Sequence, residues 1–185
     1  MDEAGRGALA GPLLVAAVIL PVPCTIAGLD DSKRLTPVVR QRLAAEIKEQ
    51  AVAFALVRCE PWEVDRVNVY EATRQAMIRA VLALKPAPGC VVSDAVPLSG
   101  LSVPVIVEAK ADAHFSCVVA ASILAKVARD EVMERLHQQV PCYGWAKNKG
   151  YPTREHRQAL STHGPSPWHR QSFAPVRVVV SKKER

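Results

Sequence analysis

Four acidic side chains, Asp2, Glu3, Asp94 and Asp112, are the residues of this chain whose types and positions could do chemistry. Carboxylate oxygens are the hard ligands that Mg²⁺ and Mn²⁺ prefer. Because crowded carboxylates repel one another, a cluster of four would be costly without a cation. Two such ions, roughly 3.5–4 Å apart, activate water and stabilise the leaving oxygen in phosphodiester hydrolysis, with no nucleophilic serine or cysteine. If the fold brings the four together, the sequence predicts two-metal chemistry of this kind.

The first two carboxylates open a glycine-rich segment, Asp2-Glu3-Ala4-Gly5-Arg6-Gly7. Such a turn lets backbone N–H groups approach a ligand closely. Adjacent residues on a regular strand face opposite sides, so both carboxylates serve one site only if the chain deflects near Glu3, which Gly5 would permit. Taken alone, the segment is more typical of an ordinary polar turn.

The other two carboxylates stand at the ends of predicted elements. Asp94 closes the apolar run that begins at Cys90, and ligand sites in α/β sheets favour the C-terminal ends of strands. The alternative is that Asp94 merely begins a turn. Asp112 precedes a long apolar helix, where its alternative role is helix capping or compensation of the helix dipole.

The hydrophobic pattern predicts the elements that must position these residues. Thr36-Pro37 is typical of an N-cap followed by proline at the first helical position. Apolar periodicity predicts strands over 15–20, 53–59, 90–94 and 103–108, and helices over 36–50, 68–84, 115–138 and, as the last, 153–162. The stretch 118–128 is almost wholly apolar and is therefore predicted to be buried, whereas 142–150 is predicted to be a polar loop. This order favours an α/β fold, a mixed β-sheet flanked by helices with a helical C-terminal lobe.

Composition limits the class of protein. The 185 residues, 49% of them hydrophobic, are enough for one compact domain. The five cysteines are odd in number, scattered and without a C-x-x-C pair, which indicates neither a disulfide framework nor a zinc site and fits a reducing cytoplasm. The longest apolar run, 13–22, is too short to span a bilayer and lacks a basic lead-in, so we expect no membrane association and no export.

Charge is distributed unevenly along the chain. Residues 1–125 hold 12 Lys and Arg against 13 Asp and Glu, whereas residues 126–185 hold 12 against 5. A basic C-terminal third indicates a polyanionic partner, although a solvated surface would have the same composition. Aromatic residues, at 5%, are too few for a broad base-stacking platform.

Five motifs follow one another along nearly the whole chain. They are Asp2-Glu3-Ala4-Gly5-Arg6-Gly7-x-x-x-Gly11-Pro12, Asp30-Asp31-Ser32-Lys33-x-Leu35, Lys110-x-Asp112 with Ala120-Ala121-Ser122-Ile123-Leu124-Ala125-Lys126-Val127-x-Arg129-Asp130, Asn148-Lys149-Gly150-Tyr151-Pro152-Thr153-x-x-His156, and His169-Arg170-x-Ser172-Phe173. Together and in this order they resemble the motifs of the ribonuclease HII family. The resemblance implies a ribonuclease H-like fold.

The resemblance also implies roles for particular residues. It implies a catalytic metal site made by Asp2, Glu3, Asp94 and Asp112, and a backbone at Gly5-Arg6-Gly7 that recognises the ribose 2′-hydroxyl. That hydroxyl is what distinguishes RNA from DNA at one position. Further nucleic-acid contacts are implied for Tyr151, which stacks on the next sugar, and for Ser32 and Lys33, which bind phosphates. We interpret Ser122 and Lys126 as helix packing and surface, and His156 and His169 as structural histidines.

Three positions depart from the family pattern. Met1 directly precedes Asp2, where the family has several apolar residues, so the first strand is expected to be short and the site less rigidly held. Ala95 and Ala111 stand where the family usually has glycine. If either backbone needs a positive φ, alanine imposes strain of roughly 1 kcal/mol or more.

The resemblance therefore predicts a metal-dependent endonuclease that uses Mn²⁺ or Mg²⁺ on RNA–DNA hybrids and on duplex DNA containing ribonucleotides. We expect a cytoplasmic monomer with one domain, made of a catalytic core (1–138), a substrate-binding lobe (139–180) and a polar tail (181–185). One alternative is a non-catalytic or weakly active hybrid-binding protein with an incomplete first strand. Another is an enzyme restricted to longer RNA tracts, like ribonuclease HIII, which Tyr151 within Gly-Tyr-Pro-Thr disfavours.

Overall fold

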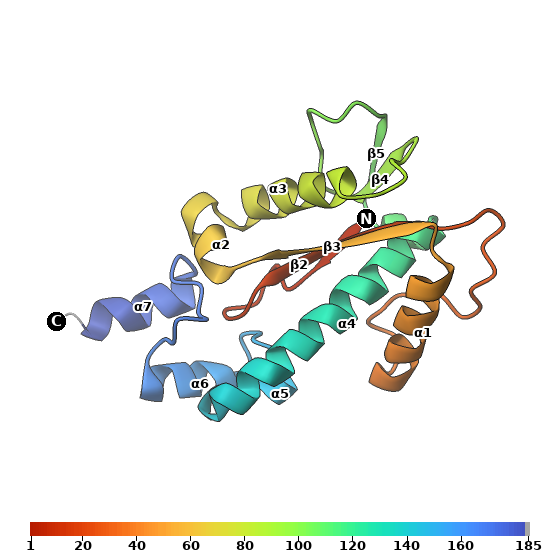
Figure 1. Cartoon of the computed structure of the whole chain (residues 1–185). Coiled ribbons are helices and arrows are strands. Elements are labelled where there is room, and N and C mark those ends of the chain that lie inside the picture. Colours follow the sequence, from red (N-terminus) through yellow and green to blue (C-terminus); the bar gives the residue numbers. More distant parts are fainter. Residues whose placement is uncertain (184–185) are drawn as a thin grey trace.

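The computed structural model of the chain describes residues 1–183 (Figure 1). The strands are β1 (Asp2–Ala4), β2 (Leu13–Ile19), β3 (Ala53–Cys59), β4 (Val91–Asp94) and β5 (Val105–Glu108). The α-helices are α1 (Pro37–Gln50), α2 (Pro61–Val67), α3 (Val69–Leu82), α4 (Ser116–Gln139), α5 (Trp145–Asn148), α6 (Arg154–His163) and α7 (Ala174–Lys183). Two 3₁₀ turns complete the order, η1 (Ala111–Ala113) and η2 (Pro141–Tyr143). No helix within residues 1–183 is both long and apolar enough to cross a membrane.

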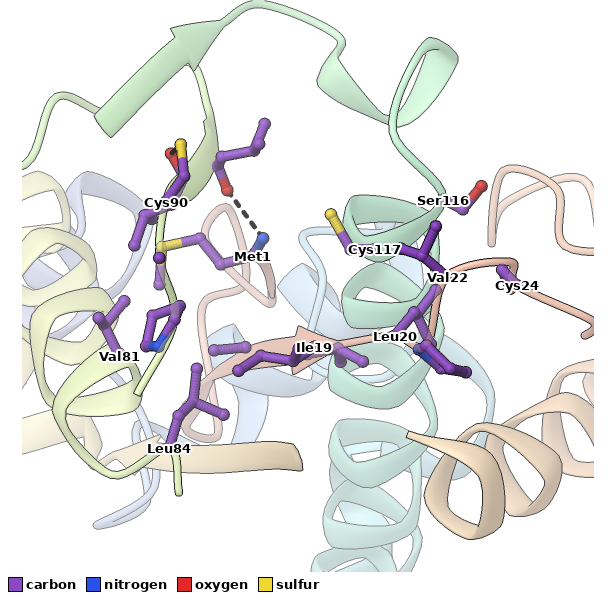
Figure 2. Close-up of a pocket in the computed structure, with 17 residues that line it drawn as sticks. Met1, Ile19, Leu20, Val22, Cys24, Val81, Leu84, Cys90, Ser116 and Cys117 are labelled. Carbon is purple, nitrogen blue, oxygen red and sulfur yellow. Dashed lines mark hydrogen bonds between the residues drawn. The ribbon is translucent and has the colours of Figure 1, made fainter. Parts of the chain in front are cut away.

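The strands form two small sheets. In the first, β1, β2 and β3 are antiparallel, with Asp2 opposite Ala16 on β2. In the second, β4 and β5 are parallel. The backbone nitrogen of Met1 donates to the carbonyl of Val92 at 2.9 Å, which brings the start of β1 beside β4 (Figure 2). The predicted mixture of parallel and antiparallel pairing is confirmed.

Helices cover both faces of the three-stranded sheet (Figure 1). Alternate residues of β2 face opposite sides, as the two-residue period of a strand requires. Val15 packs into a core with Met77 of α3, whereas Ala16 packs into a core with Ile123 of α4 and Leu43 of α1. The apolar middle of α4 is buried as predicted. The long helix α4 therefore packs against β1, the strand that carries Asp2 and Glu3.

The N-terminal ends of the helices show which local sequence signals were sufficient to predict where a helix begins. The Thr36 side chain accepts from Val39 N, which confirms the predicted cap of α1. The helix expected over 68–84 begins after Asn68, whose side chain accepts from Glu71 N. Helix α2 was missed because Glu60 precedes it, a residue outside the usual capping types.

The C-terminal lobe is more ordered than predicted. The polar loop expected over 142–150 is wrong, because that stretch contains α5 and the buried rings of Tyr143 and Trp145, stacked at 4.9 Å. Helix α6 is not the last, since α7 follows it and buries Val176 in a cluster with Leu160. Residues 181–183 of the predicted polar tail belong to α7, and 184–185 lie outside the described residues.

Candidate active site

One cavity of about 420 Å³ gathers every residue for which the sequence predicted a role in the site. The lining comes from β1 and the loop after it, the loop before α1, the end of β4, η1, α4 and the segment after α5. The predicted residues that line it are Asp2, Glu3, Gly5, Arg6, Gly7, Ser32, Lys33, Asp94, Asp112 and Tyr151.

Two further residues of the cavity wall are Ser122 and Lys126, both on α4. Ser122 Oγ lies 2.8 Å from Ser32 Oγ, and Lys126 Nζ donates to Asp130 at 2.7 Å. Our interpretation of the two as helix packing and surface was therefore incomplete. The signal that could have revealed them is their spacing, because residues four apart share one face of a helix.

Asp2 and Glu3 both line the cavity although they are neighbours on one strand. The strand ends at Ala4, and Gly5 has a φ of +93°. A Cβ at Gly5 would clash with Nε of the buried Arg129 beneath it. Glycine is therefore needed here for both the left-handed turn and the close approach of a side chain.

The environment of β1 disfavours ionised carboxylates. Burial raises the pKa of Asp2. Burial, with the charge of Asp2 adding to it, raises the pKa of Glu3 to about 7, although Arg6 at 3.5 Å opposes that rise. The pair thus stores electrostatic repulsion that a bound cation would relieve.

Asp94 and Asp112 come from the second sheet and the turn that follows it. Asp94 Oδ1 accepts from the backbone nitrogen of Lys110 at 2.7 Å, so this carboxylate holds the turn that carries Asp112. Helix α4 begins after Phe115 with no side-chain cap and no acidic residue in its first turn. The alternative that Asp112 caps this helix is therefore wrong.

The chemistry of the donor set fits a divalent cation. Within the described residues, no three His, Cys, Asp or Glu side chains converge closely enough to form a ready ligand set, so the four carboxylates line the wall without meeting. Glu3 Oε2 is nevertheless buried with no hydrogen-bond partner among those residues. A buried carboxylate oxygen without a donor is costly, and a cation in the cavity would satisfy it.

We expect metal-free Glu3→Gln protein to be more stable than metal-free wild type, by a margin that grows with pH. The folded pKa of Glu3 is about 7 against a model value of 4.5, so the folded state keeps a proton that the unfolded state has released. The stability that this proton contributes is lost as pH rises through 7, up to about 3 kcal/mol at 1.36 kcal/mol per unit.

Thermal unfolding in EDTA at pH 5 and pH 8 measures this margin. The comparison with Glu3→Gln cancels pH effects of groups that do not interact with Glu3, such as His169, whose pKa burial lowers to about 4. Saturating Mg²⁺ or Mn²⁺ should stabilise wild type more than the variant at pH 8. A margin that does not change with pH contradicts the electrostatic description of Glu3.

Of the two alanines at positions where the family usually has glycine, Ala95 and Ala111, only one has a positive φ. Ala95 has a φ of +56°, in the left-handed region that favours glycine. Ala111 is not among the residues with positive φ, and the neighbouring Lys110, at +61°, takes that conformation instead. Strain is therefore expected beside Asp94 and not at Ala111.

We expect Ala95→Gly to raise the free energy of unfolding by about 1 kcal/mol, because glycine adopts a positive φ without a Cβ penalty. The matched control is Ala111→Gly, at a fully buried position without that conformation, which should destabilise the protein. Denaturant unfolding of both variants measures the difference. An Ala95→Gly protein that is less stable than wild type would contradict the backbone strain expected at Ala95.

Tyr151 presents its ring at the edge of the cavity. The side chain is 36% exposed, so it is not a core tyrosine. The guanidinium of Arg129 lies 5.2 Å from the ring centroid, and His156 Nδ1 bonds the Tyr151 carbonyl at 2.9 Å. No described residue hydrogen-bonds the phenolic hydroxyl. The contact with Arg129 and the hydrogen bond of His156 therefore fix the position of the ring, and the phenolic hydroxyl is free to face a ligand.

The two histidines of the C-terminal motifs lie outside the cavity wall. His156 Nε2 and His169 Nε2 are 3.1 Å apart, and Trp145 Nε1 donates to His156. Burial lowers the pKa of both rings, so they are neutral at pH 7. These contacts are those of structural histidines.

A second cavity, of about 390 Å³, lies beside Met1 (Figure 2). Its walls are mostly apolar, with Cys24, Cys90 and Cys117 among them and no Asp, Glu, Lys, Arg or His. All five cysteines of the chain are free in this structure. This cavity therefore has no carboxylate side chain that could hold a cation as the first can.

Two small sheets, one antiparallel and one parallel, and a long buried helix bring four carboxylates to one cavity, an arrangement typical of nucleases of the ribonuclease H-like class. The family model described as "Ribonuclease HII" matches residues 1–176. A ribonuclease HII of Desulfitobacterium hafniense is 51% identical over 176 residues, which cover 95% of this chain and 68% of that protein. The chain belongs to the ribonuclease HII family, and it is an endoribonuclease acting on the RNA of RNA–DNA hybrids.

Solved structures share the fold. The ribonuclease H2 of Pyrococcus horikoshii has a TM-score of 0.83 and 26% identity, covering 100% of this chain and 97% of that one. A Bst-RNase HIII crystallised in complex with Mn²⁺ has a TM-score of 0.76 and 23% identity, covering 100% of this chain and 69% of that one. The predicted ribonuclease H-like fold is confirmed.

Proposed function

We propose that the protein cuts the phosphodiester on the 5′ side of a ribonucleotide, both in RNA–DNA hybrids and where one ribonucleotide is embedded in duplex DNA. The products would carry 3′-hydroxyl and 5′-phosphate ends. The observation that supports this proposal is the single cavity that gathers four carboxylates, the Gly5-Arg6-Gly7 loop and an exposed tyrosine ring. This cavity therefore combines carboxylates that can support phosphodiester hydrolysis with groups that can recognise a sugar.

The residues proposed to hold Mg²⁺ or Mn²⁺ are Asp2, Glu3, Asp94 and Asp112. Two bound ions would supply an activated water and charge stabilisation at the leaving oxygen. The Mn²⁺ in the related RNase HIII supports a divalent cation in this fold. The raised pKa of Glu3 makes cation binding favour higher pH, because the carboxylate must be ionised to serve as a ligand.

The sugar and phosphates are proposed to be bound by the remainder of the wall. The exposed Gly7 offers its backbone N–H to the 2′-hydroxyl, and Tyr151 stacks on the neighbouring sugar. Ser32 and Lys33 contact phosphate oxygens. The basic C-terminal lobe, 139–180, would add phosphate contacts along the duplex, with 1–138 as the catalytic core. We further propose a cytoplasmic monomer that works in the removal of ribonucleotides from DNA.

The test is cleavage of a labelled duplex that contains one ribonucleotide, run with Mg²⁺, with Mn²⁺ and with EDTA. We expect one cut on the 5′ side of the ribonucleotide with either metal and none in EDTA. The matched all-DNA duplex should stay intact. Binding without cleavage under all three conditions would favour the non-catalytic alternative, and cleavage only of long hybrids would favour an activity like that of ribonuclease HIII.

A further inference from the structure

Two fully buried arginines lie beneath the glycine loop of the cavity. Arg129 on α4 and Arg170 before α7 each have 0% exposure. Neither guanidinium forms an ion pair with a carboxylate in the described part of the chain. Burial lowers the pKa of Arg170 to about 9, with Arg129 adding to the shift, so Arg170 remains protonated at pH 7. Two buried cations without counter-ions require a strong set of hydrogen-bond acceptors.

Those acceptors are backbone carbonyls of the chain that follows the carboxylates. Arg129 donates to Pro12 O, Ala10 O and Lys149 O at 3.0, 3.1 and 2.9 Å. Arg170 donates to Gly11 O through two nitrogens, at 3.2 and 3.0 Å, and to Arg6 O at 3.0 Å. The two side chains together therefore hold segment 6–12 from its inner side.

These hydrogen bonds set the direction in which the peptide groups of segment 6–12 point. In a trans peptide the C=O of one residue and the N–H of the next point in opposite directions. Because Arg170 draws the Arg6 carbonyl inward, the Gly7 N–H points away from the buried guanidinium. Within the described residues that N–H has no acceptor, and Gly7 is exposed on the cavity wall.

Arg129 also connects this loop to the aromatic ring on the other side of the cavity. Its Nε lies directly under Gly5, its guanidinium lies 5.2 Å from the Tyr151 centroid, and it bonds the carbonyl of Lys149. One side chain thus touches both parts of the wall proposed to contact sugars. A shift of this guanidinium would displace the glycine loop and the ring together.

We propose that Arg129 and Arg170 are positioning residues that determine specificity for a ribonucleotide, by fixing the Gly7 N–H and the Tyr151 ring relative to the carboxylates. The inference rests on the proposed function and adds to it two residues that never touch the substrate. A displacement of about 1 Å in such a wall is enough to cost up to roughly a hundredfold in rate.

The test uses Arg129→Lys and Arg170→Lys, which keep the charge but cannot reach several carbonyls at once. The matched control is Arg135→Lys, an exposed arginine on the same helix as Arg129. Two quantities are measured for each protein. One is kcat/KM on the single-ribonucleotide duplex with Mg²⁺, and the other is the ratio of Kd values in EDTA for the all-DNA duplex and the ribonucleotide duplex.

We expect both lysine variants to lose about tenfold or more in kcat/KM and most of the binding preference for the ribonucleotide, while affinity for all-DNA duplex changes less than twofold. Arg135→Lys should match wild type. Partial unfolding alone would weaken binding to both duplexes equally, so folded variants that keep the wild-type Kd ratio overturn the proposal.

If neither lysine variant folds, Phe173→Leu decides. This change removes the ring that lies 5.3 Å from the Arg170 guanidinium, so it should loosen the hold of that guanidinium on the carbonyls of Arg6 and Gly11. A reduced Kd ratio supports the positioning role, and an unchanged ratio overturns it. A wild-type protein that does not cut at the ribonucleotide contradicts the proposed function instead, so the two failures are distinguishable.

Discussion

Asp2→Asn and Asp112→Asn should each nearly abolish cleavage while the protein still folds and binds hybrid. Each change removes one ligand charge from the cavity wall without creating a cavity. Metal stabilisation of a developing charge is worth several kcal/mol, which corresponds to a loss of roughly 10²–10⁴ in kcat at 1.36 kcal/mol per factor of ten. Because burial raises the pKa of Asp2, Asp2→Asn should not lower the melting temperature of the metal-free protein.

The measurement is single-turnover cleavage of the ribonucleotide duplex together with hybrid binding in EDTA. Removing a negative charge near the phosphates should leave binding equal or slightly tighter at low salt. The matched control is Glu49→Gln, an exposed carboxylate on α1 that should retain full activity. Turnover within about threefold of wild type for either aspartate variant would remove that residue from the proposed metal site.

Tyr151→Ala should lose about 5- to 150-fold in kcat/KM on a single embedded ribonucleotide, whereas Tyr151→Phe should keep most of the activity. Stacking contacts are worth roughly 1–3 kcal/mol by alanine substitution, and each 1.4 kcal/mol is a factor of ten. The hydroxyl has no partner among the described residues, so its removal breaks no internal bond. The ring is 36% exposed, so its loss should lower the melting temperature only slightly.

Comparing single-ribonucleotide and continuous-hybrid substrates separates recognition from folding. A Tyr151→Ala protein that melts far below wild type and loses activity equally on both substrates has lost a structural residue, and the recognition role then fails. Gly150→Ala is not a useful control, because a Cβ at Gly150 would clash with the Ala10 carbonyl. An alanine at the exposed Trp62 of α2, which lies outside the cavity wall, tests whether loss of any surface aromatic ring has this effect.

The sequence was sufficient to predict residues that line one cavity, because they lie in short motifs beside strong local signals. Asp94 closes a short apolar run, and the structure places it at the end of β4. Thr36-Pro37 begins α1 as predicted. Ser122 and Lys126 were not assigned to the wall, because the sequence of a helix buried on most sides does not show which face meets a cavity.

The misses in the C-terminal lobe have a different cause. Trp145 and Tyr143 pack in a long-range cluster with His156 and His169, which local polarity does not reveal. Helix α7 contains consecutive valines, which favour strands locally, yet the burial of Val176 against Leu160 stabilises a helix there. The role of the arginines under the glycine loop was not predicted for the same reason, because most of their acceptors are carbonyls more than a hundred residues away.

The division of the strands between two sheets has a consequence for motion. Asp2 and Glu3 stand on the antiparallel sheet, whereas Asp94 stands on the parallel pair, which contains only β4 and β5 among the described strands. A two-stranded unit has few ladder bonds and opens at a lower free energy than the covered centre of a domain. A cation that takes oxygens from both sheets would therefore also be a cross-link, and its binding free energy would oppose local opening of β4 and β5.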